Sequence, residues 1–327
     1  MSQVASDLGQ SPILQGGGVA EEKVKGKTPW QLFMGRFRQD KASLLGLVFI
    51  TILVLLALFA PLVAKLVGHG PNELLQSETL DAFGIPVMGP SSDFFFGADI
   101  SGRDLFVRVL YGARTSLQVA IIATGLSVFI GVVLGMIAGY YGRWLDVLIS
   151  RSIEILLSIP YLLLALGISA ACSTTVEGCL GGSIKPGMSL VIFIIVFFTW
   201  PFIARIVRGN TISLREKEFI EASRSLGASN RRIMFKEILP NLIAPVIIYS
   251  TLLIPSNIIF ESSLSFLGLG VPQDTPSWGA QLADAARIFD VAWWTMFFPG
   301  LFLVLTTLSF NLLGDGLRDA LDPRTGR

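Results

Sequence analysis

Two long apolar runs flank a charged, helix-forming segment that reads Glu218-Phe219-Ile220-Glu221-Ala222-Ser223-Arg224-Ser225-Leu226-Gly227-Ala228-Ser229. Each flanking run is long enough to cross a bilayer, which takes about 20 residues. A membrane protein that concentrates so much charge in one short loop is expected to present that loop to a soluble partner. The segment therefore indicates a membrane pathway whose energy is supplied by another protein.

The composition supports a membrane protein. Of 327 residues, 52% are hydrophobic and only 15% are charged, whereas a soluble domain of this size carries more polar surface. The net charge of +1 does not indicate a nucleic-acid partner. One histidine, His69, and two cysteines, Cys172 and Cys179, are too few for a metal cluster or a catalytic constellation. No cleavable signal is expected, because the first apolar run follows a polar, glycine-rich tail.

The sequence predicts an all-α polytopic membrane protein with six transmembrane helices, since hydrocarbon offers backbone groups no water. The expected spans are 43–64, 116–138, 145–171, 188–207, 242–267 and 292–313.

The basic residues predict the orientation. On one side of these spans lie 19 of the 25 Lys and Arg residues, so we expect that side, with both termini, to be cytoplasmic. The expected organisation is a disordered cytoplasmic tail (1–27), an interfacial amphipathic helix (28–41), a first transmembrane helix (43–67) and an external loop (68–114). A five-helix core (115–314), with a cytoplasmic loop at 208–240, and a cytoplasmic tail (315–327) follow. A plain linker is the alternative for 28–41.

Local signals predict a helix-turn-helix within this cytoplasmic loop. Ser213 and Glu216 have the spacing of a capping box at a helix start. Gly227 suits the left-handed stop of that helix, and Ser229 can cap a second helix that extends through Ile238. The apolar stripe on the first helix consists of Phe219, Ala222 and Leu226. An ordinary charged loop is the alternative.

The spacing of Glu221, Gly227 and Leu239-Pro240 resembles the Glu-Ala-Ala loop of binding-protein-dependent ABC importer permeases. Ser223 stands where that pattern has its second alanine. In that family the loop is a coupling helix that docks on an ATPase subunit. The resemblance implies docking through Glu221, Ala222, Ser223 and Gly227, with Phe219 and Leu226 as apolar contacts.

Further motifs over 28–324 resemble the second permease subunit of the peptide/nickel branch of that family. They include Arg36-Phe37-Arg38, Phe96-Gly97-Ala98-Asp99, Leu110-Tyr111-Gly112-Ala113-Arg114, Gly139-Tyr140-Tyr141-Gly142 and Pro276-Ser277-Trp278-Gly279. Two departures are Ser92-Asp93 before Phe94-Phe95 and an insert at 172–186.

This resemblance implies a type I, methionine-permease-like transmembrane domain that imports di- or oligopeptides across a bacterial inner membrane. It implies a second homologous permease, two ATP-binding cassette subunits that bind ATP and Mg²⁺, and an extracytoplasmic solute-binding protein. No cofactor is expected in this chain. Nickel, oligosaccharide and opine import are alternatives within the class. A secondary transporter driven by an ion gradient is the rival from another class, although it would need midplane carboxylates and repeat symmetry.

Several residues inside the spans invite a functional or a structural interpretation. Gly131, Gly135 and Gly139 permit close helix packing, and packing within the subunit is the preferred interpretation. Arg151 and Glu154 are interpreted as a structural pair. The candidates for the translocation pathway are Glu261, Pro160 and Pro201, since a carboxylate or a kink within a span often marks such a path.

The small loop after the third span contains both cysteines. Cys172 and Cys179 could close a disulfide on an oxidising side of the membrane, and two free thiols are the alternative. His69 is interpreted as a surface residue.

Overall fold

The computed structural model describes residues 29–173, 179, 184–272 and 274–321. These residues are mostly helical, and they contain only isolated bridges in place of β-strands. In chain order the elements are α1 (Pro29–Phe37), α2 (Lys41–Leu58), α3 (Ala60–Val67), α4 (Gln76–Thr79), α5 (Leu105–Tyr141), α6 (Arg143–Ser158), α7 (Tyr161–Ser173), α8 (Met188–Arg215), α9 (Glu218–Ser225), α10 (Asn230–Arg232), the π-helix η1 (Ile233–Ile238), α11 (Leu239–Phe266), α12 (Trp278–Ala285) and α13 (Trp294–Leu321).

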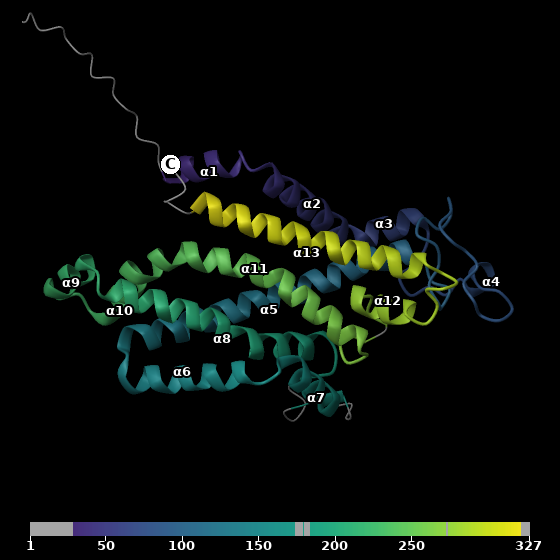
Figure 1. Cartoon of the computed structure of the whole chain (residues 1–327). Coiled ribbons are helices and arrows are strands. Elements are labelled where there is room, and N and C mark those ends of the chain that lie inside the picture. The colour runs from purple at the N-terminus through teal and green to yellow at the C-terminus, as the bar shows by residue number, and fades with distance from the viewer. Residues whose placement is uncertain (1–28, 174–178, 180–183, 273, 322–327) are drawn as a thin grey trace, which may run out of the picture.

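Long helices run side by side and give the molecule two distinct ends (Figure 1). Helices α1, α9 and α10 lie at one end with the last turn of α13, and we call this the α9 end. Helices α3, α4 and α12 lie at the opposite end, which we call the α12 end. The segments that the basic residues assign to one side of the membrane therefore gather at one end of the bundle.

Five helical segments of the described chain are long and apolar enough to cross a membrane: α2, α5, α8, the continuous segment Asn230–Phe266, and α13. A sixth crossing exists if the bent pair α6 and α7 counts as one span. The prediction of an all-α polytopic membrane protein is thus confirmed.

The third expected span, 145–171, is not one straight helix. Helices α6 and α7 meet at an angle of 86°. The break follows from Pro160, whose ring drives the preceding residue out of the helical region. Ile159 accordingly has extended dihedral angles, with φ −88° and ψ 134°. Pro160 thus ends one helix, where a kink within a continuous span was expected.

The central contact of the bundle joins α5 to α8. A Cβ atom added to Gly131 would lie 2.6 Å from the Ile203 Cβ, and one added to Gly135 would lie 2.5 Å from the Ala204 carbonyl oxygen. Gly139 approaches Thr211 in the same way. The absence of side chains at this spacing lets the two backbones approach closely. These glycines therefore serve packing within the subunit, as the preferred interpretation predicted.

Several boundaries differ from those expected. Helix α5 begins at Leu105, inside the expected loop 68–114, because Asp104 caps it by accepting a hydrogen bond from the Val107 amide. Helix α13 continues to Leu321, so residues 315–321 are helical and not part of a tail. The expected tail 1–27 lies outside the described residues.

The expected interfacial segment 28–41 contains two separate features. Helix α1 ends at Phe37, whose side chain is buried, and α1 packs against α13. Asp40 then caps α2 by accepting a hydrogen bond of 3.0 Å from the Ala42 amide. The next turn is fixed to α13, because the Ser43 hydroxyl donates to the Leu312 carbonyl oxygen at 2.7 Å.

Candidate functional site

The candidate coupling segment starts later than its sequence suggests. Helix α8 runs through Ser213 to Arg215, so Ser213 caps nothing and the predicted capping box is wrong. Lys217 has extended dihedral angles and precedes α9 without a side-chain cap. Glu218 and Glu221 lie in the first turn of α9, where carboxylates interact favourably with the helix dipole.

A tight turn closes α9 at Gly227, which has a φ of +80°. The Ala228 amide donates to the Ser223 carbonyl oxygen at 3.0 Å, and the Gly227 amide donates to the Arg224 carbonyl oxygen at 3.0 Å. This pair of bonds is the Schellman arrangement, which places its left-handed residue directly after the helix. The predicted left-handed stop is confirmed.

The two faces of α9 have opposite environments. Glu221, Ala222, Gly227 and Phe219 are exposed, and the Leu226 side chain is 89% exposed. Ser223 is half-buried. Exposed large apolar side chains on a charged loop are typical of a surface that another protein covers. The surface formed by Phe219 and Leu226 is therefore free to contact a partner.

Ile220 anchors the opposite face, and the sequence reasoning missed it. Its side chain is 0% exposed and belongs to a cluster with Tyr140 of α5, Val207 of α8 and Ile238 of η1. Full burial of an isoleucine contributes about 1.5–3 kcal/mol. The sequence did carry a signal for this burial: Ile220 directly follows Phe219, and adjacent residues of a helix lie on different faces.

The second half of the segment continues directly into a membrane span. The Ser229 hydroxyl accepts a hydrogen bond from the Arg232 amide at 3.4 Å, which confirms the predicted cap. The chain then passes through η1 into α11 without leaving the helix. A π-helical turn inside a longer helix frequently occurs at a functional site. A force on α9 therefore has a continuous helical route into the bundle.

Polar contacts fix this segment to its neighbours. The Tyr140 hydroxyl donates to the Asn230 side-chain oxygen at 2.9 Å, and Arg215 Nη1 donates to the Tyr140 carbonyl oxygen at 3.2 Å. Arg208 of α8 pairs with Asp146 of α6 through Nε and Nη2, with 2.7 Å between Nη2 and Oδ2. These contacts connect α5, α6 and α8 at the α9 end.

Arg151 and Glu154 form the expected pair, with 2.6 Å between Nη1 and Oε2. Both side chains are exposed, so the pair contributes at most about 1 kcal/mol to stability.

The three pathway candidates have different surroundings. Glu261 is 0% exposed, and its carboxylate accepts hydrogen bonds of 2.8 Å from the hydroxyls of Ser116 and Ser265. The structure thus encloses Glu261 among hydroxyl donors. Pro201 is buried within α8, while Pro160 is exposed at the break between α6 and α7.

A disulfide joins Cys172, at the end of α7, to Cys179. Cys172 also packs among apolar side chains that include Ala165 and Leu190. The bond therefore fixes Cys179 to the apolar cluster that contains Cys172.

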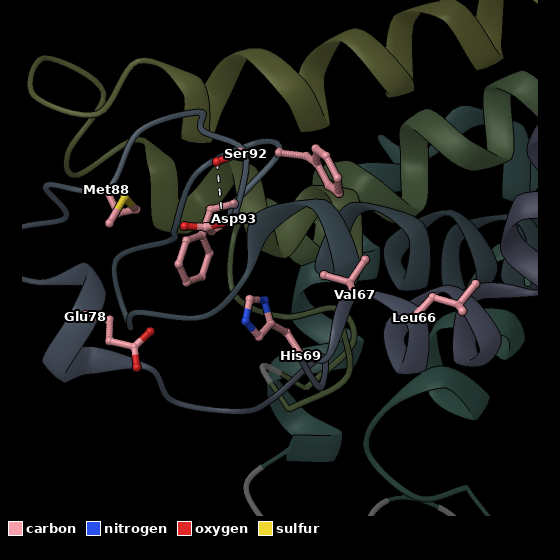
Figure 2. Close-up of a pocket in the computed structure, with 9 residues that line it drawn as sticks. Leu66, Val67, His69, Glu78, Met88, Ser92 and Asp93 are labelled. Atoms are coloured by element: carbon pink, nitrogen blue, oxygen red, sulfur yellow. Dashed lines mark hydrogen bonds between the residues drawn. The ribbon is translucent and has the colours of Figure 1, made fainter.

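An open cavity of about 940 Å³ lies at the α12 end and is lined by residues of α3, α4 and the segment 88–95 (Figure 2). His69 lines this cavity and is half-buried, whereas a surface residue was expected. Its Nδ1 lies 2.8 Å from Asp104 Oδ2, and its ring stacks on Phe94 with 4.9 Å between centroids. His69 therefore connects the start of the loop that follows α3 to Asp104, the N-terminal cap of α5.

Comparison with known proteins identifies similar chains. The family described as binding-protein-dependent transport system inner membrane component matches residues 131–327. The family described as N-terminal TM domain of oligopeptide transport permease C matches residues 28–77.

Similar curated proteins cover nearly the whole chain. The dipeptide transport system permease protein DppC of Alkalihalophilus pseudofirmus is 40% identical over 306 residues, which are 93% of each chain. The glutathione transport system permease protein GsiD of Escherichia coli is 39% identical over 91% of each chain. The oligopeptide transport system permease protein OppC of Bacillus subtilis is 33% identical over 99% of each chain.

A solved structure shares the fold. An inward-facing conformation of the MetNI methionine ABC transporter matches with a TM-score of 0.54 and 20% identity, covering 67% of this chain and 98% of that chain. The expectation of a methionine-permease-like fold is confirmed.

Proposed function

Because this chain belongs to the family of binding-protein-dependent transport system inner membrane components, we propose that it is the permease subunit through which an ABC importer carries di- and oligopeptides. The peptide substrate is supported by relatives named for dipeptide, oligopeptide and glutathione transport. The chain itself forms part of the membrane pathway, and we assign it no catalytic residue.

The proposed assembly pairs this chain with a second homologous permease, two ATP-binding cassette subunits and an extracytoplasmic solute-binding protein. ATP and Mg²⁺ would be bound by the cassette subunits. In a bacterial inner membrane the α9 end would face the cytoplasm with both termini, and α1 would lie along the inner surface. The concentration of Lys and Arg at that end supports this orientation.

One observation supports coupling through α9 in particular. The exposed Phe219 and Leu226 face away from the bundle, while the buried Ile220 and the bond between Tyr140 and Asn230 fix the other face to it. Glu221, Ala222, Ser223 and Gly227 would contribute the rest of the docking surface. A partner that closes on ATP would move α9, and the continuous helix into α11 would carry that motion to the pathway.

Reconstitution tests this function. The chain would be purified with its co-expressed partners and placed in vesicles, and uptake of a labelled tripeptide would be measured with the solute-binding protein present. We expect uptake that requires ATP and that persists when ion gradients are collapsed. Uptake that follows an ion gradient without ATP would contradict the proposal. Uptake of nickel or an oligosaccharide, but not of peptide, would show that the importer carries that solute and not peptides.

A further inference from the structure

A groove at the α12 end lies between α12 and the turn that follows α11. The cavity measures about 320 Å³. One wall is formed by Ala280, Ala283 and Asp284, whose spacing places them on one face of α12, and by Arg287 in the turn that follows α12. The opposite wall is the turn 265–272, and Gly187 at the start of α8 closes the side.

The walls are built to leave space. Ala280 and Ala283 on one side, and Gly268 and Gly270 on the other, have short side chains or none, which leaves part of the space between the walls unfilled. The turn is held in place from behind: Gly268 adopts a φ of +76°, and the Leu269 amide donates to the Leu264 carbonyl oxygen at 3.0 Å. The Ser169 hydroxyl of α7 also donates to the Leu269 carbonyl oxygen. The groove is therefore a pre-formed feature.

Two opposite charges lie along this wall, Asp284 on α12 and Arg287 in the turn that follows it. The Asp284 carboxylate is mostly buried, and its nearest cationic contact is Arg103 Nη2 at 3.6 Å. Burial raises the pKa of Asp284, and the nearby Asp99 carboxylate adds to this effect, while Arg103, Arg108 and Arg287 offset it only in part. Arg287 is exposed and forms no ion pair within 4 Å among the described residues. An additional cation would complete the partial compensation of Asp284, and an anion would find in Arg287 a partner that no described carboxylate occupies within 4 Å.

We propose that this groove binds a short zwitterionic peptide, with the ligand's ammonium group at Asp284 and its carboxylate at Arg287. The volume lies at the low end of small-molecule sites, which span about 300–1,000 Å³, and this favours a ligand of two or three small residues. The acid and the base together favour a ligand that carries both charges over a simple anion or cation. The inference rests on the proposed function and adds to it a recognition site within the permease.

The test measures direct binding to the purified transporter complex in lipid nanodiscs, without the solute-binding protein. The probes are trialanine, trialanine amide, which lacks the carboxylate, and N-acetyl-trialanine, which lacks the ammonium group. Arg287→Gln is expected to weaken trialanine binding about tenfold, the size of one charge-assisted hydrogen bond, and to leave the amide unaffected. Asp284→Asn is expected to have the same effect on trialanine and none on the acetylated peptide.

Three further variants control for indirect effects. Ala283→Leu fills the groove without changing charge and should weaken all three probes. Lys65→Gln on α3 and Asp290→Asn beyond α12 remove exposed charges elsewhere at this end and should leave binding unchanged. Because Arg287 has no ion pair among the described residues, Arg287→Gln should keep the wild-type melting temperature. Asp284→Asn removes the partner of Arg103 and can lower the melting temperature.

An unchanged ratio of trialanine to amide affinity in Arg287→Gln would overturn the groove assignment. The proposed function is judged separately, by ATP-dependent peptide uptake of the wild-type complex. If the wild-type complex takes up peptide normally but Arg287→Gln leaves the preference for trialanine over its amide unchanged, the groove assignment alone is refuted. Absence of peptide uptake in the wild type would refute the transport function.

Discussion

The hydroxyl of Tyr140, in the last turn of α5, donates a hydrogen bond of 2.9 Å to the side-chain oxygen of Asn230, at the start of α10. The two residues belong to segments that the chain separates by the whole of α6, α7, α8 and α9. Their contact fixes the far side of the α9 turn to α5. In the proposed coupling, a motion of α9 would therefore reach α5 as well as α11.

Tyr140→Phe removes this bond but keeps the buried ring. Because Asn230 is exposed, water can replace the hydroxyl, and the loss of stability should be at the low end of about 0.5–1.5 kcal/mol. We expect ATP hydrolysis to continue while peptide uptake per ATP falls. The neighbouring exposed residue gives the control, Tyr141→Phe, which should behave as wild type. Equal uptake per ATP in both variants would contradict the transmission role.

Gly227→Pro should abolish uptake and leave membrane insertion intact. Proline cannot adopt the positive φ of this position, and it removes the amide that donates to the Arg224 carbonyl oxygen. Gly227→Ala keeps the amide and should cost about 1 kcal/mol of local stability because of the positive φ alone, since a Cβ meets nothing within 4 Å. Gly209→Ala, also in open space but inside α8, is the matched control. Normal uptake by the proline variant would exclude a docking role for the turn.

Leu226→Ser should reduce ATP-driven uptake strongly without changing the melting temperature, because the side chain is 89% exposed and supports no internal packing. Phe83→Ser is the control, since Phe83 is equally exposed but lies in the loop at the α12 end. Co-purification of the ATPase subunit is the second measurement. A variant that retains its ATPase and its uptake would show that Leu226 is outside the interface.

Gly135→Ala should destabilise the protein by about 1–3 kcal/mol, because the new methyl group would lie 2.5 Å from the Ala204 carbonyl oxygen and 2.9 Å from the Val207 Cβ. Gly125→Ala on the same helix meets nothing within 4 Å and should be neutral or slightly stabilising. Thermal unfolding in detergent distinguishes the two. Similar melting temperatures would contradict the close approach of α5 and α8.

Reduction of the bond between Cys172 and Cys179 should lower stability by about 2–3 kcal/mol, the value for a short closed loop. Cys179→Ser should lower the melting temperature to the same extent and make it insensitive to reductant. We specify Cys179 because Cys172 is buried in an apolar cluster, where a hydroxyl would add a separate penalty. A wild-type melting temperature that ignores reductant would argue against the bond.

Features with a local physical cause could be predicted from the sequence. The left-handed Gly227, the Ser229 cap and the packing glycines of α5 each follow from one residue type at one position. The capping box at Ser213 failed because Leu214 packs into the cluster around Ile220, and this packing continues α8 past the local signal. The bond between His69 and Asp104 could not be predicted, since it depends on how a loop folds back over 35 positions.

The break at Pro160 could be foreseen only in part. Proline predicts a disturbed helix, but the 86° angle depends on where α7 finds apolar contacts, and these come from α5, α8 and α11. The burial of Ile220 could not be predicted for the same reason, because the other buried residues of its cluster come from four different helices.

The break at Pro160 limits how far α6 extends across the membrane. With 16 residues, α6 is about 24 Å long, whereas the hydrocarbon layer is about 30 Å thick. Arg151 and Glu154 shorten its apolar length further. The bilayer beside α6 must therefore become thinner locally, or a neighbouring subunit must cover the part of the hydrocarbon layer that α6 does not span. The activity of the protein should accordingly depend on the acyl-chain length of its membrane lipids.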